Sequence, residues 1–278
     1  MTTLLSGCGA LRIAYDRAPD VVYWWVDGYA DFDDTQSERA SVELDRFFAW
    51  HRRTQLPDYA GLLSRIQPQV AAAEPLTAVQ MCQWFDEAAT RVPPLLDRAL
   101  PVVADMAMTL TPAQLRHVER KYEKTNANFR DDYLQPDPEE RLDESVERVV
   151  DRAESIYGRL DAPQKALARR LVAASPFDPA LWLAERQQRQ KDLLATLRQL
   201  HAERASPDRV QAALRTLVAR MQVSPREPYR QYAQRLRTYN CDLAAQLHNA
   251  TTREQRQKAS ERLKGWAEDF RVLSAAAR

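Results

Sequence analysis

The sequence predicts an all-α protein, an elongated multi-helix bundle of about ten or eleven amphipathic helices. The 278-residue chain contains only six glycines, whereas the tight hairpins that join β-strands commonly require glycine. It also carries 40 Lys and Arg against 39 Asp and Glu, a charge-rich composition typical of long helices with exposed polar faces. The net charge of +1 gives no reason to expect a nucleic acid as partner.

A short apolar run at 21–26 is the first element, and it includes Tyr23, Trp24 and Trp25. It is too short to span a bilayer. We expect either a first helix or tucked segment whose rings fill the core, or side chains at a lipid interface, which Trp and Tyr favour. The carboxylates at 27–34 lack the ligand spacing of an EF-hand loop, so no metal is expected there. They suit the positive end of the next helix instead.

Capping signals and hydrophobic periodicity place the helices of the first half. Pro57 should end the first long helix, and Pro101 should kink or split the fourth. The expected helices span 35–53, 58–73, 77–91 and 94–108.

The strongest helix signal covers 110–134. Thr111 suits the capping position, Pro112 the first helical position, and Gln114 stands where its side chain can reach back to the free amide. An apolar stripe follows at helical spacing, with charged residues on the other faces. The stripe consists of Leu115, Val118, Tyr122 and Phe129.

The second half continues with six helical patterns. Gly158 is the expected stop of the first of them. We expect residues 9–278 to form one all-α domain, either undivided or as two lobes, 9–107 and 108–278. The six patterns span 138–158, 162–174, 179–203, 207–222, 226–248 and 252–274.

The first eight residues end in Leu5-Ser6-Gly7-Cys8, which resembles a bacterial lipobox and makes Cys8 the candidate lipidation site. Residues 1–8 are then the remnant of a lipoprotein signal. A signal peptide needs a longer apolar stretch than the seven residues before Cys8. Either the native precursor begins further upstream or the match is fortuitous. Gly9, rather than aspartate, after the cysteine implies anchoring to the outer membrane, with the protein in the periplasm.

One pattern recurs at helix starts: Leu, a capping residue, two positions, then Gln. It stands at Leu76-Thr77-x-x-Gln80 and at Leu110-Thr111-x-x-Gln114, with variants at 160–164 and 251–255. It is explained either by local helix capping or by kinship with periplasmic chaperones of the Spy and CpxP type, whose Leu-Thr-x-x-Gln motif it resembles. Kinship makes these six residues candidate binding residues, and the lipid-interface interpretation does the same for Tyr23, Trp24 and Trp25.

A broader resemblance covers nearly the whole chain. It rests on LLSGCGALRIAYDRAP, YWWVDGYADFDD, FFAWHRRTQLPDYA and RLVAASPFDPALWLAERQQRQ, in this order. These segments resemble a family of uncharacterised proteobacterial lipoproteins known only as a domain of unknown function. The resemblance implies a lipidated Cys8 and supplies no activity.

The sequence contains none of the common catalytic or metal-binding patterns. The histidines at 51, 117, 201 and 248 have no second ligand at helical spacing, and there is no nucleophile elbow or phosphate-binding glycine loop. We therefore expect no metal, no cofactor and no enzymatic activity. Cys82 and Cys241 are expected to be free and buried, with a disulfide as the less favoured alternative in an oxidising periplasm.

These observations predict a membrane-anchored periplasmic lipoprotein that acts by protein binding, with chaperone-like action toward envelope proteins as the specific form. A structural or scaffolding lipoprotein is the alternative, and an envelope enzyme is the third class. The expected partners are the membrane, through the lipid anchor, and an envelope protein.

Overall fold

The computed structural model describes residues 9–276, and within them every regular element is a helix. The predicted all-α helical bundle is confirmed, with thirteen helices in the described part of the chain. In chain order they are α1 (Ala10–Asp16), α2 (Ala18–Ala30), α3 (Asp34–Thr54), α4 (Leu56–Ala71), α5 (Ala78–Ala89), α6 (Val92–Thr109), α7 (Pro112–Tyr133), α8 (Pro138–Tyr157), α9 (Ala162–Ala173), α10 (Pro179–Ala202), α11 (Pro207–Gln222), α12 (Glu227–Asn249) and α13 (Arg253–Ala275).

The helix starts follow the capping residues. Thr111 accepts a hydrogen bond from the Gln114 amide, and the Gln114 side chain accepts one from the Thr111 amide, so α7 begins with the expected capping box. Its apolar stripe is buried or half-buried, as predicted. Gly158 ends α8 with a positive φ of 77°, a conformation that glycine adopts without steric cost.

The structure differs from the sequence expectations at Arg17 and, in part, at Pro101. The N-terminal segment forms two helices rather than one element, divided at Arg17, which brings the number of helices above the expected ten or eleven. Helix α6 runs through Pro101 without being split. Proline leaves the carbonyl four residues earlier without its helical donor, but Asp97 and Pro101 both lie on the exposed side of α6, where water can supply one.

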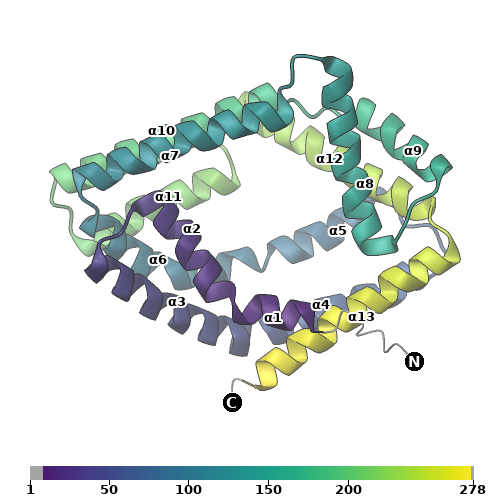
Figure 1. The fold of residues 1–278 in the computed structure, drawn as a ribbon, viewed down its shortest axis with the longest axis horizontal. Coiled ribbons are helices and arrows are strands. Elements are labelled where there is room, and N and C mark those ends of the chain that lie inside the picture. The colour runs from purple at the N-terminus through teal and green to yellow at the C-terminus, as the bar shows by residue number, and fades with distance from the viewer. Residues whose placement is uncertain (1–8, 277–278) are drawn as a thin grey trace.

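The helices follow the outline of a broad ring when viewed down the shortest axis (Figure 1). On one side α7 and α10 run together, and on the other α13 packs along α4. Helix α5 pairs with α12, and α1 contacts α13, so the first and last described helices meet. Helices from both sides of residue 108 therefore pack on each other, and the division into lobes stays a prediction.

The buried apolar side chains form several separate clusters, each between a few helices. The largest joins α6, α7, α10 and α11, a second joins α5 and α12, and a third lies between α8 and α9. Burying one Leu or Val side chain completely stabilises the folded state by roughly 1.5–3 kcal/mol relative to leaving it exposed. No helix in the described part of the chain is both long and apolar enough to cross a bilayer.

Candidate functional site

An open groove of about 820 Å³ lies between α7, α8, α10 and α12, with the α9–α10 connection at its edge. Ligand sites in proteins typically have volumes of about 300–1,000 Å³ and combine apolar walls with a few polar groups. The groove has this composition. Its apolar lining includes the half-buried side chains of Leu142, Val149, Val172, Leu236 and Leu243.

Stacked aromatic rings form one wall of the groove. Phe129 lies between Tyr133 and Trp182, with both pairs of ring centroids 4.6 Å apart and nearly parallel. Phe177 meets Tyr133 edge-on at 6.2 Å. These rings come from α7, α10 and the α9–α10 connection, so three segments must fold together to build the wall.

Arginines dominate the charge of the groove, which is lined by four of them and by a single acidic residue, Asp132. The Arg148 guanidinium lies 4.3 Å from the centre of the Tyr133 ring, and that of Arg186 lies 5.7 Å from the Trp182 ring. Both positions allow cation–π attraction. The other two arginines are Arg141 and Arg152.

None of the candidate residues predicted from the sequence lines this groove. Arg141, Arg148 and Arg152 are spaced seven and four residues apart, which places them on one face of α8. Leu142 and Val149 of the same helix also line the groove. The sequence signal that could have indicated the groove was therefore the row of arginines next to the apolar stripe of the predicted helix 138–158. Helical periodicity did not show that α7, α10 and α12 leave this face uncovered.

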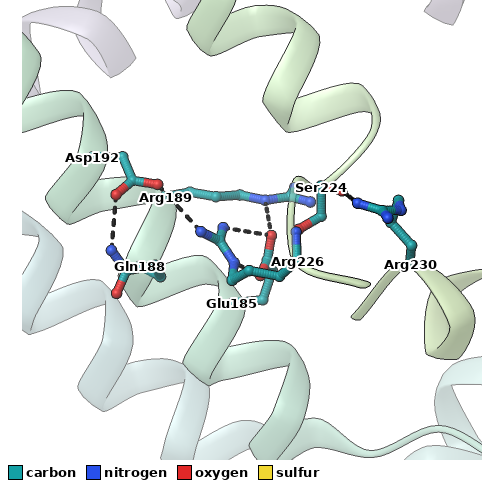
Figure 2. A network of polar contacts seen from close by, with 7 residues as sticks. All are labelled: Glu185, Gln188, Arg189, Asp192, Ser224, Arg226 and Arg230. Carbon is teal, nitrogen blue, oxygen red and sulfur yellow. Dashed lines mark hydrogen bonds and ion pairs between the residues drawn. The ribbon is translucent and has the colours of Figure 1, made fainter. Parts of the chain in front are cut away.

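A buried carboxylate anchors the side of α10 next to the groove (Figure 2). The Glu185 side chain is only 3% exposed and accepts hydrogen bonds from Arg189 Nε at 2.8 Å and from Arg226 Nη2 at 2.9 Å. Burial alone would raise the pKa of Glu185, but hydrogen bonds from Arg226, Arg189 and Ser224 outweigh it and hold the pKa at about 2. Arg226 also approaches Asp192 at 3.4 Å.

This network fixes the α11–α12 connection to α10, because Ser224 and Arg226 belong to the connection and Glu185 to the helix. Glu185 also borders a smaller cavity of about 180 Å³ that shares Trp182 and Arg186 with the groove. The network therefore supports the backbone from which these two groove residues project. Every charge drawn in it has an opposite partner or a backbone acceptor, so its role is structural.

The two tryptophans of α2 do not fill the core, which corrects one of the two expectations for them. Trp24 is 68% and Trp25 65% exposed, Val21 is exposed, and Tyr23 is half-buried. Positions 21, 24 and 25 share one helical face, while Ala30 is buried where α2 packs against α3 and α7. A continuous apolar run covers the whole circumference of a helix, so part of it must face away from the core.

The recurring motifs are helix caps, and most of their glutamines bridge two helices. Gln114 donates to Gln36 Oε1 at 2.6 Å and to the Asp31 carbonyl at 2.7 Å. Gln36 caps α3 in the same way and donates to the Thr109 carbonyl at 3.0 Å. The two capping boxes thus share one buried glutamine pair.

A second pair repeats this geometry at the starts of α9 and α13. Gln164 donates to Gln255 Oε1 at 2.7 Å and to the Ala250 carbonyl at 2.9 Å, and Gln255 donates to the Arg159 carbonyl at 2.9 Å. Both glutamines are buried.

The motif at residues 76–80 stands alone. Thr77 and Gln80 form a capping box, but Gln80 has no glutamine partner among the described residues. Buried Leu76 instead exchanges two backbone hydrogen bonds with the Asn249 side chain. Leu110 is half-buried against the largest core cluster. The geometry of all these caps is explained by helix initiation, and binding through them stays a prediction.

Cys82 and Cys241 form a disulfide, which corrects the expectation of free thiols. Helix α5 packs against α12, and the two Cα atoms lie 5.3 Å apart, within the range that a disulfide bridges. The residues are 159 positions apart in sequence, so no local pattern indicated their proximity. Cys8 lies outside the described residues, and its lipidation stays a prediction.

His51 and His248 each contact a tyrosine hydroxyl inside the fold. Tyr15 Oη lies 2.7 Å from His51 Nδ1, and Tyr157 Oη lies 3.0 Å from His248 Nδ1. Burial is the main cause that lowers the pKa of His248 to about 4. Within residues 9–276, no group of His, Cys, Asp and Glu converges as it would around a metal ion. Asp33, from the acidic cluster, caps α3.

The chain belongs to the family of unknown function DUF6279, whose match covers residues 28–230. The matched range contains the groove helices α7, α8 and α10 and reaches the first turn of α12. No curated protein and no solved structure matches the chain.

Proposed function

We propose that the protein is a lipoprotein of the bacterial envelope that is anchored to the outer membrane through Cys8 and acts in the periplasm by binding other proteins. The specific form of this binding activity that we propose is chaperone-like action toward envelope proteins. The observation that carries the binding role is the open groove, in which aromatic rings and arginines stand together on a frame of packed helices. Aromatic side chains and arginine are the residues most enriched at the energetic centres of protein interfaces.

The disulfide supports the compartment. Disulfides persist in oxidising surroundings such as the bacterial periplasm and are rare in a reducing cytosol. The Cys82–Cys241 bond joins α5 to α12, and Cys241 is completely buried within their contact. A protein built around such a bond is suited to an exported location.

The exposed face of α2 supports a position beside the membrane. Val21, Trp24 and Trp25 stand on one side of α2, and the exposed Ile13 lies on α1, close in sequence to Cys8. Trp is enriched at the interface between lipid and water. Apolar side chains that enter the lipid beside the acyl chains would add buried apolar area and so strengthen the attachment.

The groove, rather than the recurring motifs, is the proposed binding surface. Gln114 and Leu76 are buried, and the capping hydrogen bonds occupy the polar groups of Thr111 and Thr77. Residues of the groove such as Asn128 and Arg152 are exposed. A client therefore meets the groove without unfolding any helix start.

The proposed location and lipid anchor are tested on the native gene product expressed in a Gram-negative host. Intact mass and membrane fractionation are compared for the wild type and Cys8→Ser. We expect a diacylglyceryl mass increment and membrane association that both disappear in the variant. Trapping the thiols in cells should also show Cys82 and Cys241 protected until a reductant is added. An unmodified protein with free thiols in the cytosol would refute the proposed location.

The binding role is tested by crosslinking in cells. A photoreactive residue replaces Asn128 in the groove, and a matched one replaces Arg46, an exposed residue of α3 that is not part of the groove. Crosslinks to many proteins from position 128 alone support chaperone-like action, and crosslinks to one protein support binding of a dedicated partner. Equal or absent crosslinking at the two positions contradicts binding through the groove.

A further inference from the structure

Three of the four arginines that line the groove form no ion pair with any described residue. Elsewhere Arg169 contacts Asp143 and Glu139, and Arg198 contacts Glu119 at 2.7 Å. In the groove, by contrast, neither Arg152 nor Arg186 forms an ion pair with any described residue. With Asp132 as the only acidic residue in the lining, the groove is a cationic surface in a chain whose net charge is only +1.

The remaining two arginines are only weakly compensated. Arg148 meets Glu144 at 3.3 Å on its own helix, and Arg141 donates to the Gln135 carbonyl, which carries no net charge. Both guanidinium groups are held in place by these contacts, and Arg148 also by the Tyr133 ring. A guanidinium that is fixed in position loses little side-chain entropy when an anion binds to it.

The spacing of the cations indicates an extended partner. A helix rises 1.5 Å per residue, so Arg141, Arg148 and Arg152 extend over roughly 16 Å along α8. Arg186 adds a fourth cation from α10. A single phosphate or carboxylate would meet only one or two of these positions. A segment with several carboxylates along its length can pair with all of them.

The remaining lining indicates a partner that is also apolar. The floor offers half-buried aliphatic side chains beside the rings of Phe129 and Phe177. The exposed amides of Asn128 and Asn240 provide donors and acceptors for a polypeptide backbone. A lipid has one headgroup and no backbone amides, so it would leave most of these polar groups without a partner.

We propose that the groove between α7, α8, α10 and α12 binds an acidic amphipathic polypeptide segment, whose carboxylates pair with the four arginines and whose apolar side chains pack on the aromatic wall. This inference rests on the proposed protein-binding function and names the chemistry of the partner. Amphipathic helices commonly bind in grooves of this kind through apolar residues spaced three and four apart.

The test measures binding of labelled synthetic peptides to the purified disulfide-bonded protein by fluorescence anisotropy. One peptide is an amphipathic helix with Glu on its polar face and Leu on the other, and the second carries Lys in place of Glu. We expect saturable binding of the Glu peptide only, weakened by added salt because exposed charges are screened. Saturable binding of both peptides, or of neither, would overturn the inference.

Charge reversal locates the binding site. Arg152→Glu with Arg186→Glu should weaken binding of the Glu peptide by about tenfold or more. The matched control is Arg215→Glu with Arg220→Glu, two arginines of α11 outside the groove that make the same change in net charge. Circular dichroism confirms that both variants fold. An equal loss in the two variants would mean that net charge, and not the groove, governs binding.

Two further experiments distinguish failure of the acidic-partner inference from failure of the proposed protein-binding function. Vesicles containing phosphatidylglycerol replace the peptide, and binding of vesicles but not peptide through Arg152 and Arg186 would assign the groove to lipid and overturn the inference. The crosslinking from position 128 is then repeated in cells with the groove double variant. Crosslinks that persist there leave protein binding intact but refute the acidic partner, whereas crosslinks lost only with the groove variant support it.

Discussion

The glutamine pairs Gln36–Gln114 and Gln164–Gln255 make the same contacts in different parts of the ring. In each pair the first helix start is capped by an aspartate and the second by a threonine, and each glutamine donates to the carbonyl two residues before its partner's cap. The members are 78 residues apart in one pair and 91 in the other. In each pair, two helix starts that are far apart in sequence are thus joined by the same arrangement of hydrogen bonds.

The surroundings of the two pairs differ. Near the first, the side chain of His117 is partly exposed and contacts Asp31 at 3.7 Å. Near the second, His248 is completely buried beside Tyr157, and Asn249 ties the end of α12 to Leu76, where α5 begins. The disulfide joins α5 and α12 as well. An identical local motif therefore lies in a more tightly connected and more acid-sensitive region at its second occurrence.

Removing the disulfide should have the largest effect and should act mainly on the second region. Cys82→Ala with Cys241→Ala removes a link between residues 159 positions apart. For a loop of this length the chain-entropy argument gives a loss of about 5 kcal/mol in the free energy of unfolding. Chemical denaturation measures this loss. Hydrogen exchange should show that α5 and α12 lose more protection than α3 and α7, and equal losses in all four helices would contradict the difference between the regions.

Acidification should have the next largest effect, through His248. Its pKa is about 4 in the folded protein and 6.5 in the unfolded chain, so the unfolded chain binds the proton first as the pH falls. Stability should therefore decline between pH 6.5 and pH 4, by about 3 kcal/mol at pH 4.

The variant His248→Phe isolates this contribution. It keeps a ring at the buried site, removes the titrating group, and should flatten the dependence of unfolding free energy on pH over that interval. Burial also lowers the pKa of His51, which contributes a decline of the same sign to both proteins and cancels in the difference. Parallel pH curves for the wild type and the variant would rule out His248 as the source.

The smallest effects should distinguish the paired caps from the single one. Gln255→Ala leaves the Arg159 carbonyl and the Thr252 amide without their partner and should cost about 2–3 kcal/mol. Gln114→Ala should cost about the same. Gln80→Ala removes only a local capping bond and should cost roughly 0.5–1 kcal/mol. Thermal or urea unfolding of the three variants gives the comparison, and a Gln80 variant as unstable as the others would show that pairing adds nothing.

The sequence predicted the helices well because their signals are local. A cap, a proline at the first position and a stripe of apolar residues lie within one or two turns of each other, as in α7. The same locality explains why the division at Arg17 was missed and why a split at Pro101, one of the two expected outcomes, does not occur. Whether a chain bends or continues there depends on what covers each side of the helix, and no pattern within the helix contains that information.

The candidate site was missed for a related reason. The capping role of Gln114 was readable from Thr111, but its partner Gln36 was not, since 78 residues separate them. The groove likewise unites Phe129, Arg152, Trp182 and Leu236, and a single sequence does not tell which helix faces remain uncovered. Cys82 and Cys241 show the same limit.

The contact between α4 and α13 sets the order in which this molecule can be completed. Helix α4 ends at Ala71, yet the surface it packs against begins at Arg253, almost at the other end of the chain. Contacts between such distant segments form slowly because a long loop must close first. During synthesis or export from the N-terminus, the side of α4 that faces α13 therefore stays uncovered until α13 has emerged. A helper protein that covers this side of α4 during that interval would protect the chain from aggregation and raise the yield of folded protein.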